Sequence, residues 1–501
     1  MSEKIQNFIM GNPERALRFM TTFPEKFWNK KGEKAALEAF DQALNSPAYR
    51  EILNKAGIDP DNIVSVEDLK KLPLTQKDNY FSHSKFTDLY QVDEEDIFGI
   101  CFTSGTTGNP ASSIYSKKSI SKAITGILNF LHYYWNIASP KKKTMAMNAF
   151  AAGPWTAFFI TNSFLVTQGL KYNISLSIPG ADPIGVLETI KRVGERYDQI
   201  IIGAYPSTIK TIIEEGNKKK IDWSKYYITF VTAGEPLTRG LYDYILDNID
   251  PEKKDGMRIL DLYASTEGSA SGLSTPLTKA IDKIAREDKK FREEVFGQNE
   301  LSSIFQYNPM ICYLEIVDEK LIITRPGPIP LVRYAIGDFG KIISFEEMEK
   351  KLKDMGYDLE ELSQSISPGK PLFKWPFFVS MGRSDDMVIA YSGAKIHTRV
   401  LLPLLENNKE LNSFKITSKM DSSYDNRLVV YLELKEGMKV NSEIEERYEK
   451  RIHERLLESS IDYADAYRLS PKKTAPEIGI YSFGEGPFKG DKEAPKQKFK
   501  V

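Results

Sequence analysis

The sequence predicts an α/β fold: a large N-terminal α/β domain with mixed and mostly parallel sheets, followed by a small α+β C-terminal domain. Three observations lead to it. Between about residues 100 and 340, apolar β-rich runs alternate with amphipathic helical patterns, as in successive βαβ units. Two later apolar runs separated by Asp318-Glu319 are typical of a hairpin. After residue 426, one further strand pattern and one helical pattern indicate a separate compact unit.

The first hundred residues are predicted to be mainly helical. Leu37, Phe40 and Leu44 recur at helical spacing, and a short helix over residues 66–69 should stop before Pro73. The most apolar stretch, residues 149–166, contains a Gly-Pro pair and several polar side chains, which argues against a membrane span. We expect a buried helix there instead.

The central elements follow from apolar spacing. The expected elements are strands at Gln199–Ala204, Tyr227–Thr232 and Arg258–Tyr263, a helix around Ile209–Glu215, and a hairpin of Ile311–Val317 with Lys320–Thr324. Strands joined through helices run parallel, so this region predicts a mostly parallel sheet. The hairpin makes the fold mixed.

Loop character and charge rise between Glu346 and Lys374, and residues 381–396 are interpreted as a hinge followed by new structure. Beyond them we expect a strand at Arg427–Leu434 and a helix at Ser442–Ser459. One face of that helix would carry Ile444, Tyr448, Ile452 and Leu456. The last 18 residues hold five lysines and three glycines, a composition that predicts a mobile, solvated tail.

Composition narrows the classes of function. The chain has 501 residues, 41% hydrophobic and 27% charged, as in globular proteins. With 68 Lys and Arg against 69 Asp and Glu, the net charge of -1 offers no broad basic field, so neither nucleic acid nor a membrane is an expected partner. Cys101 and Cys312 cannot form a disulfide framework, and the first residues lack a secretory pattern, so we expect a cytoplasmic protein. The histidines show no metal-binding spacing.

A loop rich in glycine and hydroxyl side chains is the most informative motif. It reads Thr103-Ser104-Gly105-Thr106-Thr107-Gly108-Asn109-Pro110 and follows an apolar run. Glycines let main-chain N–H groups approach an anion, and hydroxyls add donors without bulk, so the loop can hold phosphates. It is not a Walker loop, because Asn109-Pro110 stands where that motif needs Lys-Ser/Thr. A plain turn is the alternative.

Four motifs follow this loop in a recognisable order. They are Thr232-Ala233-Gly234-Glu235-Pro236, Tyr263-Ala264-Ser265-Thr266-Glu267-Gly268, Arg333-Tyr334-Ala335-Ile336-Gly337-Asp338 and Gly382-Arg383-Ser384-Asp385-Asp386. With the loop, they resemble the adenylate-forming superfamily of acyl-CoA ligases and adenylation enzymes. The phenylacetate-CoA ligase branch is the most similar, on residues 68–77, 205–207 and 330–334. The resemblance covers nearly the whole chain.

The resemblance implies ATP, Mg²⁺ and coenzyme A as cofactors. Thr266 would contact the α-phosphate and Glu267 would bind Mg²⁺, a hard cation that suits a carboxylate beside phosphate oxygens. The residues assigned to the nucleotide are Thr103, Ser104, Gly105, Thr106, Thr107 and Gly108 at the β- and γ-phosphates, Gly234, Glu235 and Pro236 at the adenine, Asp338 and Arg383 at the ribose, and Tyr263.

The resemblance also implies a mobile small domain. Its hinge would be Asp385, between an N-terminal AMP-binding domain of residues 1–384 and a cap of residues 385–501. A lysine near the C-terminus would reach the substrate carboxylate and the α-phosphate. Lys498 is the candidate, with Lys496 as its rival. A mobile cation can offset charge at the reacting phosphorus.

The implied reaction is acyl-AMP formation from a carboxylic acid and ATP, followed by thioester formation with coenzyme A. Phe150, Trp155 and Tyr205 would give the acid an aromatic-walled pocket, although core packing also explains such residues. Two other interpretations stay open. An adenylating enzyme could transfer the acyl group to a carrier protein or an amine, or the chain could be an inactive nucleotide-binding regulator. A homodimer is also possible.

Overall fold

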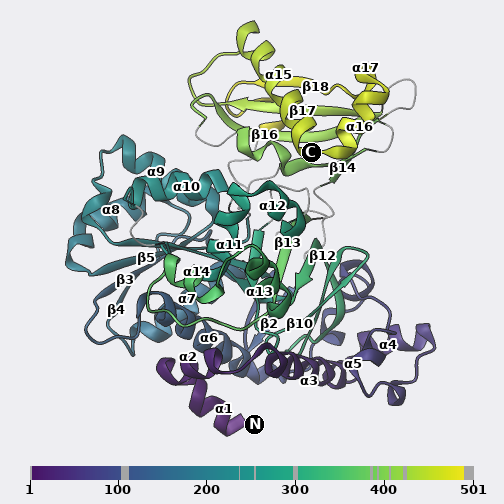
Figure 1. The fold of residues 1–501 in the computed structure, drawn as a ribbon. Coiled ribbons are helices and arrows are strands. Elements are labelled where there is room, and N and C mark those ends of the chain that lie inside the picture. Colours follow the sequence, from purple (N-terminus) through teal and green to yellow (C-terminus); the bar gives the residue numbers. More distant parts are fainter. Residues whose placement is uncertain are drawn as a thin grey trace. The chain divides into compact units, whose positions relative to one another are not determined.

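The structure is a computed structural model that describes residues 3–102, 112–235, 237, 239–252, 256–296, 303–383, 387–391, 394–404, 408–420 and 426–489. Packing divides the described residues into two compact units (Figure 1). The first consists of residues within 1–235, 246–283 and 304–379, and the second of residues within 236–245, 284–303 and 380–501.

Helices begin the first unit, and capping residues set their ends. Asn12 and Ser46 accept main-chain N–H bonds at the starts of α2 and α4, each before a proline that suits the first helical turn. Ser65 and Asp68 form a capping box on α5, so the short helix predicted at 66–69 is confirmed. These helices are α1 (Glu3–Met10), α2 (Pro13–Thr22), α3 (Glu25–Ala43), α4 (Pro47–Ala56) and α5 (Val66–Leu69).

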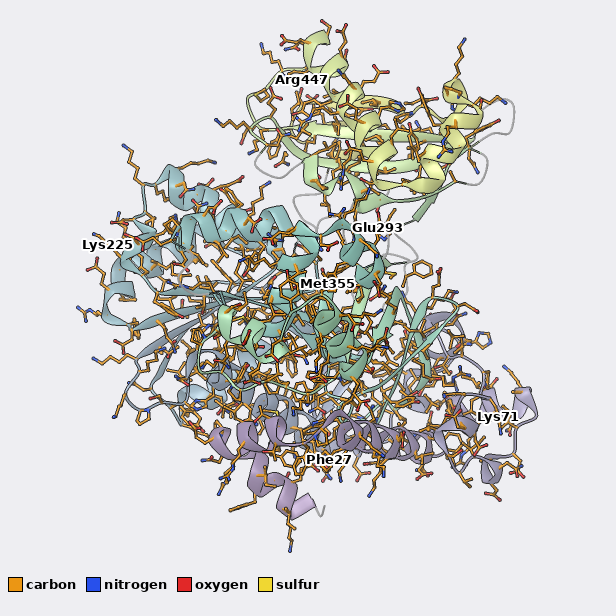
Figure 2. The ribbon with its side chains drawn as sticks, viewed as in Figure 1. Phe27, Lys71, Lys225, Glu293, Met355 and Arg447 are labelled. Atoms are coloured by element: carbon orange, nitrogen blue, oxygen red, sulfur yellow. The ribbon has the colours of Figure 1, made fainter. Side chains whose placement is uncertain are left out.

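Aromatic rings join α2 and α3 to the rest of the first unit. Phe27, labelled on α3 in Figure 2, stacks on Phe23 with ring centroids 4.1 Å apart. The neighbouring Trp28 is fully buried and meets Trp375 edge-to-face at 5.9 Å. Burial of such large rings contributes strongly to a core, so the N-terminal helices are an integral part of this unit.

Among the described residues, an eleven-stranded sheet has the order β10-β11-β12-β13-β9-β8-β7-β6-β5-β3-β4. Its β4-β3-β5-β6-β7 half is parallel, as helical connections require. The three predicted strands are confirmed, two of them starting one residue later. The elements of this half are β3 (Thr144–Asn148), β4 (Ile174–Ser177), α8 (Pro183–Val193), β5 (Gln199–Ala204), α9 (Pro206–Lys218), β6 (Ile228–Ala233), α10 (Arg239–Ile249) and β7 (Ile259–Ser265).

In the other half, the strand pairs β7–β8, β8–β9, β10–β11 and β11–β12 are antiparallel. The predicted hairpin is confirmed: Asp318 and Glu319 form its turn with φ of 49° and 62°, as a two-residue turn of this hand requires. In chain order, the elements from residue 269 to residue 383 are β8 (Ser269–Leu273), α11 (Pro276–Glu287), α12 (Lys289–Phe296), β9 (Ser303–Gln306), β10 (Tyr313–Val317), β11 (Lys320–Arg325), β12 (Leu331–Ile343), α13 (Phe345–Asp354), α14 (Leu359–Ile366) and β13 (Phe377–Arg383).

A separate hairpin of β1 (Ile97–Phe102) and β2 (Ser112–Ser116) precedes α6 (Lys117–Trp135) and α7 (Thr156–Gly169). Here the expectation of a buried helix over residues 149–166 is partly wrong. The helix begins only at Thr156, because Gly153 and Pro154 do not favour a helical backbone before it. Most of its residues are half-buried, and Val166 is 46% exposed. No helix among the described residues is long and apolar enough to cross a membrane.

The mixed α/β fold predicted from the sequence is confirmed. Helices α6 and α7 cover one face of the parallel strands, where Leu128, Phe164 and Ile201 belong to a common buried cluster. Helices α8 and α9 cover the other face (Figure 1). The carboxyl ends of the parallel strands therefore meet at one edge between two helical layers.

The second unit contains a three-stranded sheet of β16 (Leu411–Met420), β17 (Asn426–Leu434) and β18 (Glu477–Tyr481). The predicted α15 (Ser442–Ser459) is confirmed, and its four apolar residues are buried in the core of the unit. Arg447 of α15 points away from that core in Figure 2 and donates to Glu410 at 2.7 Å. The remaining elements are β14 (Met387–Ile389), β15 (Lys395–His397), α16 (Ile461–Leu469) and α17 (Pro471–Thr474).

Two further expectations need correction. The segment Glu346–Lys374, predicted to be loop, contains α13 and α14, whose N-termini are capped by Ser344 and Asp358. The predicted solvated tail is anchored in its described part. Glu433 accepts the Gly484 N–H at 2.8 Å, Lys415 contacts the Pro487 carbonyl at 2.5 Å, and Phe488 is buried. Charge-rich composition concealed the few residues that pack.

Candidate active site

The candidate site is built on the carboxyl ends of the parallel strands. β3, β5, β6 and β7 are consecutive neighbours and end at Asn148, Ala204, Ala233 and Ser265. The residues after these ends include Phe150, Tyr205, Gly234-Glu235 and Thr266-Glu267, which the sequence assigned to acid and nucleotide. In open α/β sheets this edge is where ligands bind.

The loop after β6 is tied to the start of α9. The Glu235 carboxylate accepts the Ser207 N–H at 3.0 Å, which places a negative charge at a helix N-terminus, where the helix dipole favours it. Gly234 has a φ of 80°, a conformation that a side chain would strain. Burial, with a smaller contribution from Glu235, raises the pKa of Tyr205 to about 12. This tyrosine is therefore neutral at physiological pH.

Phe150 and Tyr205 pack edge-to-face with centroids 5.0 Å apart. Both are almost fully buried, at 3% and 2% exposure, and a Cβ on Gly203 would come within 3.0 Å of the Phe150 ring. Trp155 immediately precedes α7. Its main chain forms an isolated parallel β-bridge with Phe102, the last described residue before the Gly/Thr loop. The first two of these aromatics are core partners of each other, so little of their surface faces solvent.

The turn between β7 and β8 holds Thr266 and Glu267 from several sides. The Ser265 Oγ accepts the Gly268 N–H at 2.8 Å, and the Thr156 hydroxyl donates to the Thr266 hydroxyl at 3.2 Å. Arg325 donates from Nε and Nη2 to the main-chain oxygen of Glu267, at 3.0 and 2.7 Å. The turn is thus fixed by contacts from α7 and β11 as well as its own strand.

Two predicted nucleotide residues meet directly. The Tyr263 hydroxyl donates to an Asp338 carboxylate oxygen, although 75 residues separate them. Tyr263 also packs on Phe378 at 4.7 Å, and Asp338 is only 8% exposed. This contact joins β7, the last strand of the parallel half, to β12 of the antiparallel half.

The motif at 68–77 docks onto the motif at 330–334. The Thr75 hydroxyl donates to the Val332 carbonyl at 2.8 Å, and Thr75 pairs with the main chain of Arg333 and Ala335. The Arg333 guanidinium reaches the Lys70 and Leu72 carbonyls, and its φ of 47° is unusual for a residue with a side chain. Hydrogen bonds therefore join these two motifs, although they are far apart in the sequence.

Comparison with known proteins identifies this arrangement. The profile of the AMP-binding enzyme family matches residues 27–295, more than half of the chain. The chain belongs to the AMP-binding enzyme family. A phenylacetate-coenzyme A ligase of Pseudomonas putida is 31% identical over 350 residues, 69% of this chain and 68% of that enzyme. A phenylacetate-coenzyme A ligase of Thermus thermophilus is 24% identical over 229 residues, 46% of this chain.

The alignment with the Thermus thermophilus ligase spans only 47% of that enzyme's length. Among solved structures, a 2-hydroxyisobutyryl-CoA ligase in complex with 2-HIB-AMP superposes with a TM-score of 0.64 over 97% of this chain and 91% of that one, at 14% identity. This likeness shows a shared fold. The expected membership of the phenylacetate-CoA ligase-like branch of adenylate-forming enzymes is confirmed by the relatives.

Several predicted residues of this AMP-binding enzyme lie outside the described parts of the chain. They are Thr103, Ser104, Gly105, Thr106, Thr107, Gly108, Pro236, Asp385, Lys496 and Lys498. Arg383 is described only through its main chain in β13. The structure therefore brings together Tyr263 with Asp338, and Phe150 with Tyr205, and places Glu235 and Glu267 at neighbouring strand ends.

Sequence reasoning missed Asp261, Thr156 and Arg325. Asp261 is buried on β7, and burial raises the pKa of its carboxyl to about 7 despite the opposing charge of Lys279 and the Leu262 N–H. A carboxylate in the middle of an otherwise apolar strand was the available signal. No comparable signal marked Thr156 or Arg325, because their contacts to the Thr266-Glu267 turn are distant in sequence.

Proposed function

We propose that this enzyme activates a carboxylic acid, of the aryl or acyl class, and transfers it to coenzyme A. In the first step a carboxylate oxygen of the acid attacks the α-phosphorus of ATP, forming acyl-AMP and releasing pyrophosphate. In the second, the coenzyme A thiolate attacks the acyl carbon, and AMP leaves. The observation that carries this proposal is the position of Glu235 and Thr266-Glu267 just after the ends of two neighbouring parallel strands, together with the hydrogen bond between Tyr263 and Asp338.

The described donor set suits magnesium-ATP. Glu267 supplies a carboxylate and Thr266 a hydroxyl, the hard oxygen donors that Mg²⁺ and phosphate require. Gly268 leaves space in the turn, since a Cβ there would approach the Ser265 Oγ to 2.8 Å. When bound, Mg²⁺ would offset negative charge on phosphate oxygens.

Each residue then has a defined task. Asp338, oriented by the Tyr263 hydroxyl, would accept hydrogen bonds from the ribose hydroxyls. The Glu235 loop, fixed by the Ser207 N–H, would border the adenine. Because Tyr205 stays neutral and packs on Phe150, this pair would present an apolar wall to the acid.

We extend the proposal to the residues that family resemblance alone assigns. The loop of residues 103–108 would hold the terminal phosphates, Arg383 would join Asp338 at the ribose, and Lys498 or Lys496 would approach the α-phosphate. The cap of residues 385–501 would turn about Asp385 relative to residues 1–384. Trp155 would complete the aromatic pocket.

Exchange of pyrophosphate into ATP, measured with a panel of carboxylic acids, tests the first step. Acid-dependent exchange supports the proposal, and consumption of free coenzyme A in the second step identifies the acceptor. Exchange without coenzyme A consumption would point to a carrier protein or an amine as acceptor. Nucleotide binding without any exchange would overturn the proposed catalytic activity and favour a nucleotide-binding regulator.

A further inference from the structure

The Arg325 side chain grips the turn that carries Glu267. Arg325 is the last residue of β11, and its Nε and Nη2 both donate to the main-chain oxygen of Glu267, at 3.0 and 2.7 Å. Two donors of one rigid planar group thus converge on a single acceptor. Such a fork fixes orientation as well as distance, which a single flexible donor does not.

The turn sits directly on the strand that carries this arginine. A Cβ added to Gly268 would come within 3.0 Å of Ile323 Cδ1 on β11, so the absence of a side chain permits the close approach. The hydrogen bonds from Arg325 therefore hold the main chain of Glu267 against β11.

We propose that Arg325 is a positioning residue for magnesium-dependent adenylation, because it fixes the main chain of Glu267 and thereby the direction of the carboxylate. This inference rests on the proposed function, in which Glu267 binds Mg²⁺. Arg325 acts through Glu267 and contacts neither metal nor substrate in this assignment. Groups that orient a metal ligand commonly change metal affinity by about 10- to 100-fold when removed.

Two substitutions of Arg325 separate charge from geometry. Arg325→Lys keeps a positive charge but has one point-like donor group, whereas Arg325→Met keeps an unbranched side chain without charge or donors. If the fork orients Glu267, the methionine variant should weaken the metal site most and the lysine variant should be intermediate. The lysine variant also keeps the test informative if the methionine variant folds poorly.

Arg258 provides a matched control. Arg258 immediately precedes β7, at the end of that strand opposite to the Glu267 turn. Its side chain is buried, donates to the Ile228 carbonyl at 3.0 Å and lies 3.8 Å from the Asp250 carboxylate. Like the Arg325 variant, Arg258→Met removes an arginine that donates to a main-chain carbonyl, but this one lies far along β7 from the Glu267 turn. It should reduce stability without changing the Glu267 turn.

The experiment is a calorimetric titration of Mg²⁺ into each full-length variant saturated with α,β-methylene-ATP, alongside pyrophosphate exchange at varied free Mg²⁺. We expect the metal dissociation constant and the half-saturating Mg²⁺ concentration to rise about 10-fold in Arg325→Met and by a smaller factor in Arg325→Lys. Arg258→Met should match the wild type. Coenzyme A-dependent consumption of supplied acyl-AMP should be largely kept in both Arg325 variants.

Several results would overturn the assignment. Unchanged metal affinity in both Arg325 variants would do so, as would equal shifts in Arg325→Met and Arg258→Met, or an equal loss of both half-reactions. Glu267→Gln separates the positioning role of Arg325 from the proposed binding of Mg²⁺ by Glu267. If it weakens metal binding while the Arg325 variants do not, only the positioning role is lost; if it leaves metal binding unchanged, the proposed role of Glu267 is lost as well.

Discussion

The two halves of the eleven-stranded sheet place their functional residues in different ways. In the parallel half, from β4 to β7, the strand ends themselves bring Tyr205, Glu235 and Glu267 to one edge. In the antiparallel half, single side chains do this: Arg325 holds the Glu267 carbonyl, and Asp338 meets Tyr263. Topology positions the first set, and individual hydrogen bonds position the second.

This difference predicts where substitutions should be structurally costly. A residue placed by the end of a strand can change its chemistry without loss of the strand. A residue that joins distant segments supports both of them, so its removal should lower stability. The following variants probe that distinction, beginning with the largest expected effect.

Arg333→Met should destabilise the antiparallel half most. Arg333 reaches the Lys70 and Leu72 carbonyls and lies 3.6 Å from Glu315, with both side chains below 10% exposed. Burial raises the pKa of Glu315 and Arg333 opposes that rise, so the variant leaves a buried carboxyl without its countercharge. We expect a loss of about 4 kcal/mol in the free energy of unfolding, measured with denaturant.

A double variant isolates the ion pair. Arg333→Met with Glu315→Leu removes both charges, so it should recover part of the stability lost in the single variant. If the single and double variants are equally unstable, the carbonyl contacts and not the ion pair carry the effect. If Arg333→Met costs less than about 1 kcal/mol, the side chain does not join the two motifs energetically.

Glu267→Gln tests the junction between the halves. Glutamine is nearly isosteric but lacks the charge proposed to bind Mg²⁺, so pyrophosphate exchange should fall about 100-fold, close to 3 kcal/mol in the barrier. The free energy of unfolding should hardly change, because Arg325 contacts the main chain of residue 267. Exchange at the wild-type rate would remove Glu267 from the site.

Asp261→Asn probes the parallel half through pH. The carboxyl has a pKa of about 7 in the folded chain, against 3.8 as its ordinary value. The folded state therefore binds more protons between these values, and wild-type stability must fall as pH rises through this window. The wild type should lose on the order of 2 kcal/mol between pH 5 and 8 relative to Asp261→Asn.

Chemical unfolding of both proteins at several pH values measures this difference. Asparagine does not ionise, so its stability profile lacks the contribution of residue 261. Parallel profiles for the two proteins would show that Asp261 keeps an ordinary pKa. A wild type that gains stability relative to the variant as pH rises would contradict the assigned direction.

The contacts that the sequence could predict lie mainly where strand ends position the residues, and those it could not predict depend on single side chains. Hydrophobic spacing was enough for β5, β6, β7 and α15, because these elements bury their apolar faces locally. The order of motifs assigned Tyr263, Glu267 and Asp338 to the nucleotide site by resemblance, and these roles stay predictions. The Tyr263–Asp338 hydrogen bond and the Arg325 fork depend on how β11 and β12 return to β7, which no local pattern encodes. The prediction of a solvated tail was wrong for a related reason: Phe488 is buried, although the sequence around it is rich in charged residues.

Glu235→Gln should have only a small effect on stability, because it keeps an acceptor for the Ser207 N–H and removes only the charge at the start of α9. A carboxylate at a helix N-terminus contributes about 0.3–1 kcal/mol, and salt screens that interaction. We expect the free energy of unfolding to fall by less than about 1 kcal/mol in low salt, and the difference from the wild type to shrink in 1 M NaCl (Debye length about 3 Å).

Ser207→Ala is the matched control for this cap. The bond to Glu235 uses the main-chain N–H of residue 207, which alanine retains, so this variant should be as stable as the wild type. A loss in Ser207→Ala equal to that in Glu235→Gln would show that the serine hydroxyl, rather than the helix end, governs the loop. A loss above about 3 kcal/mol in Glu235→Gln would mean that Glu235 joins distant segments as Arg333 does, and the contrast between the two halves of the sheet would fail.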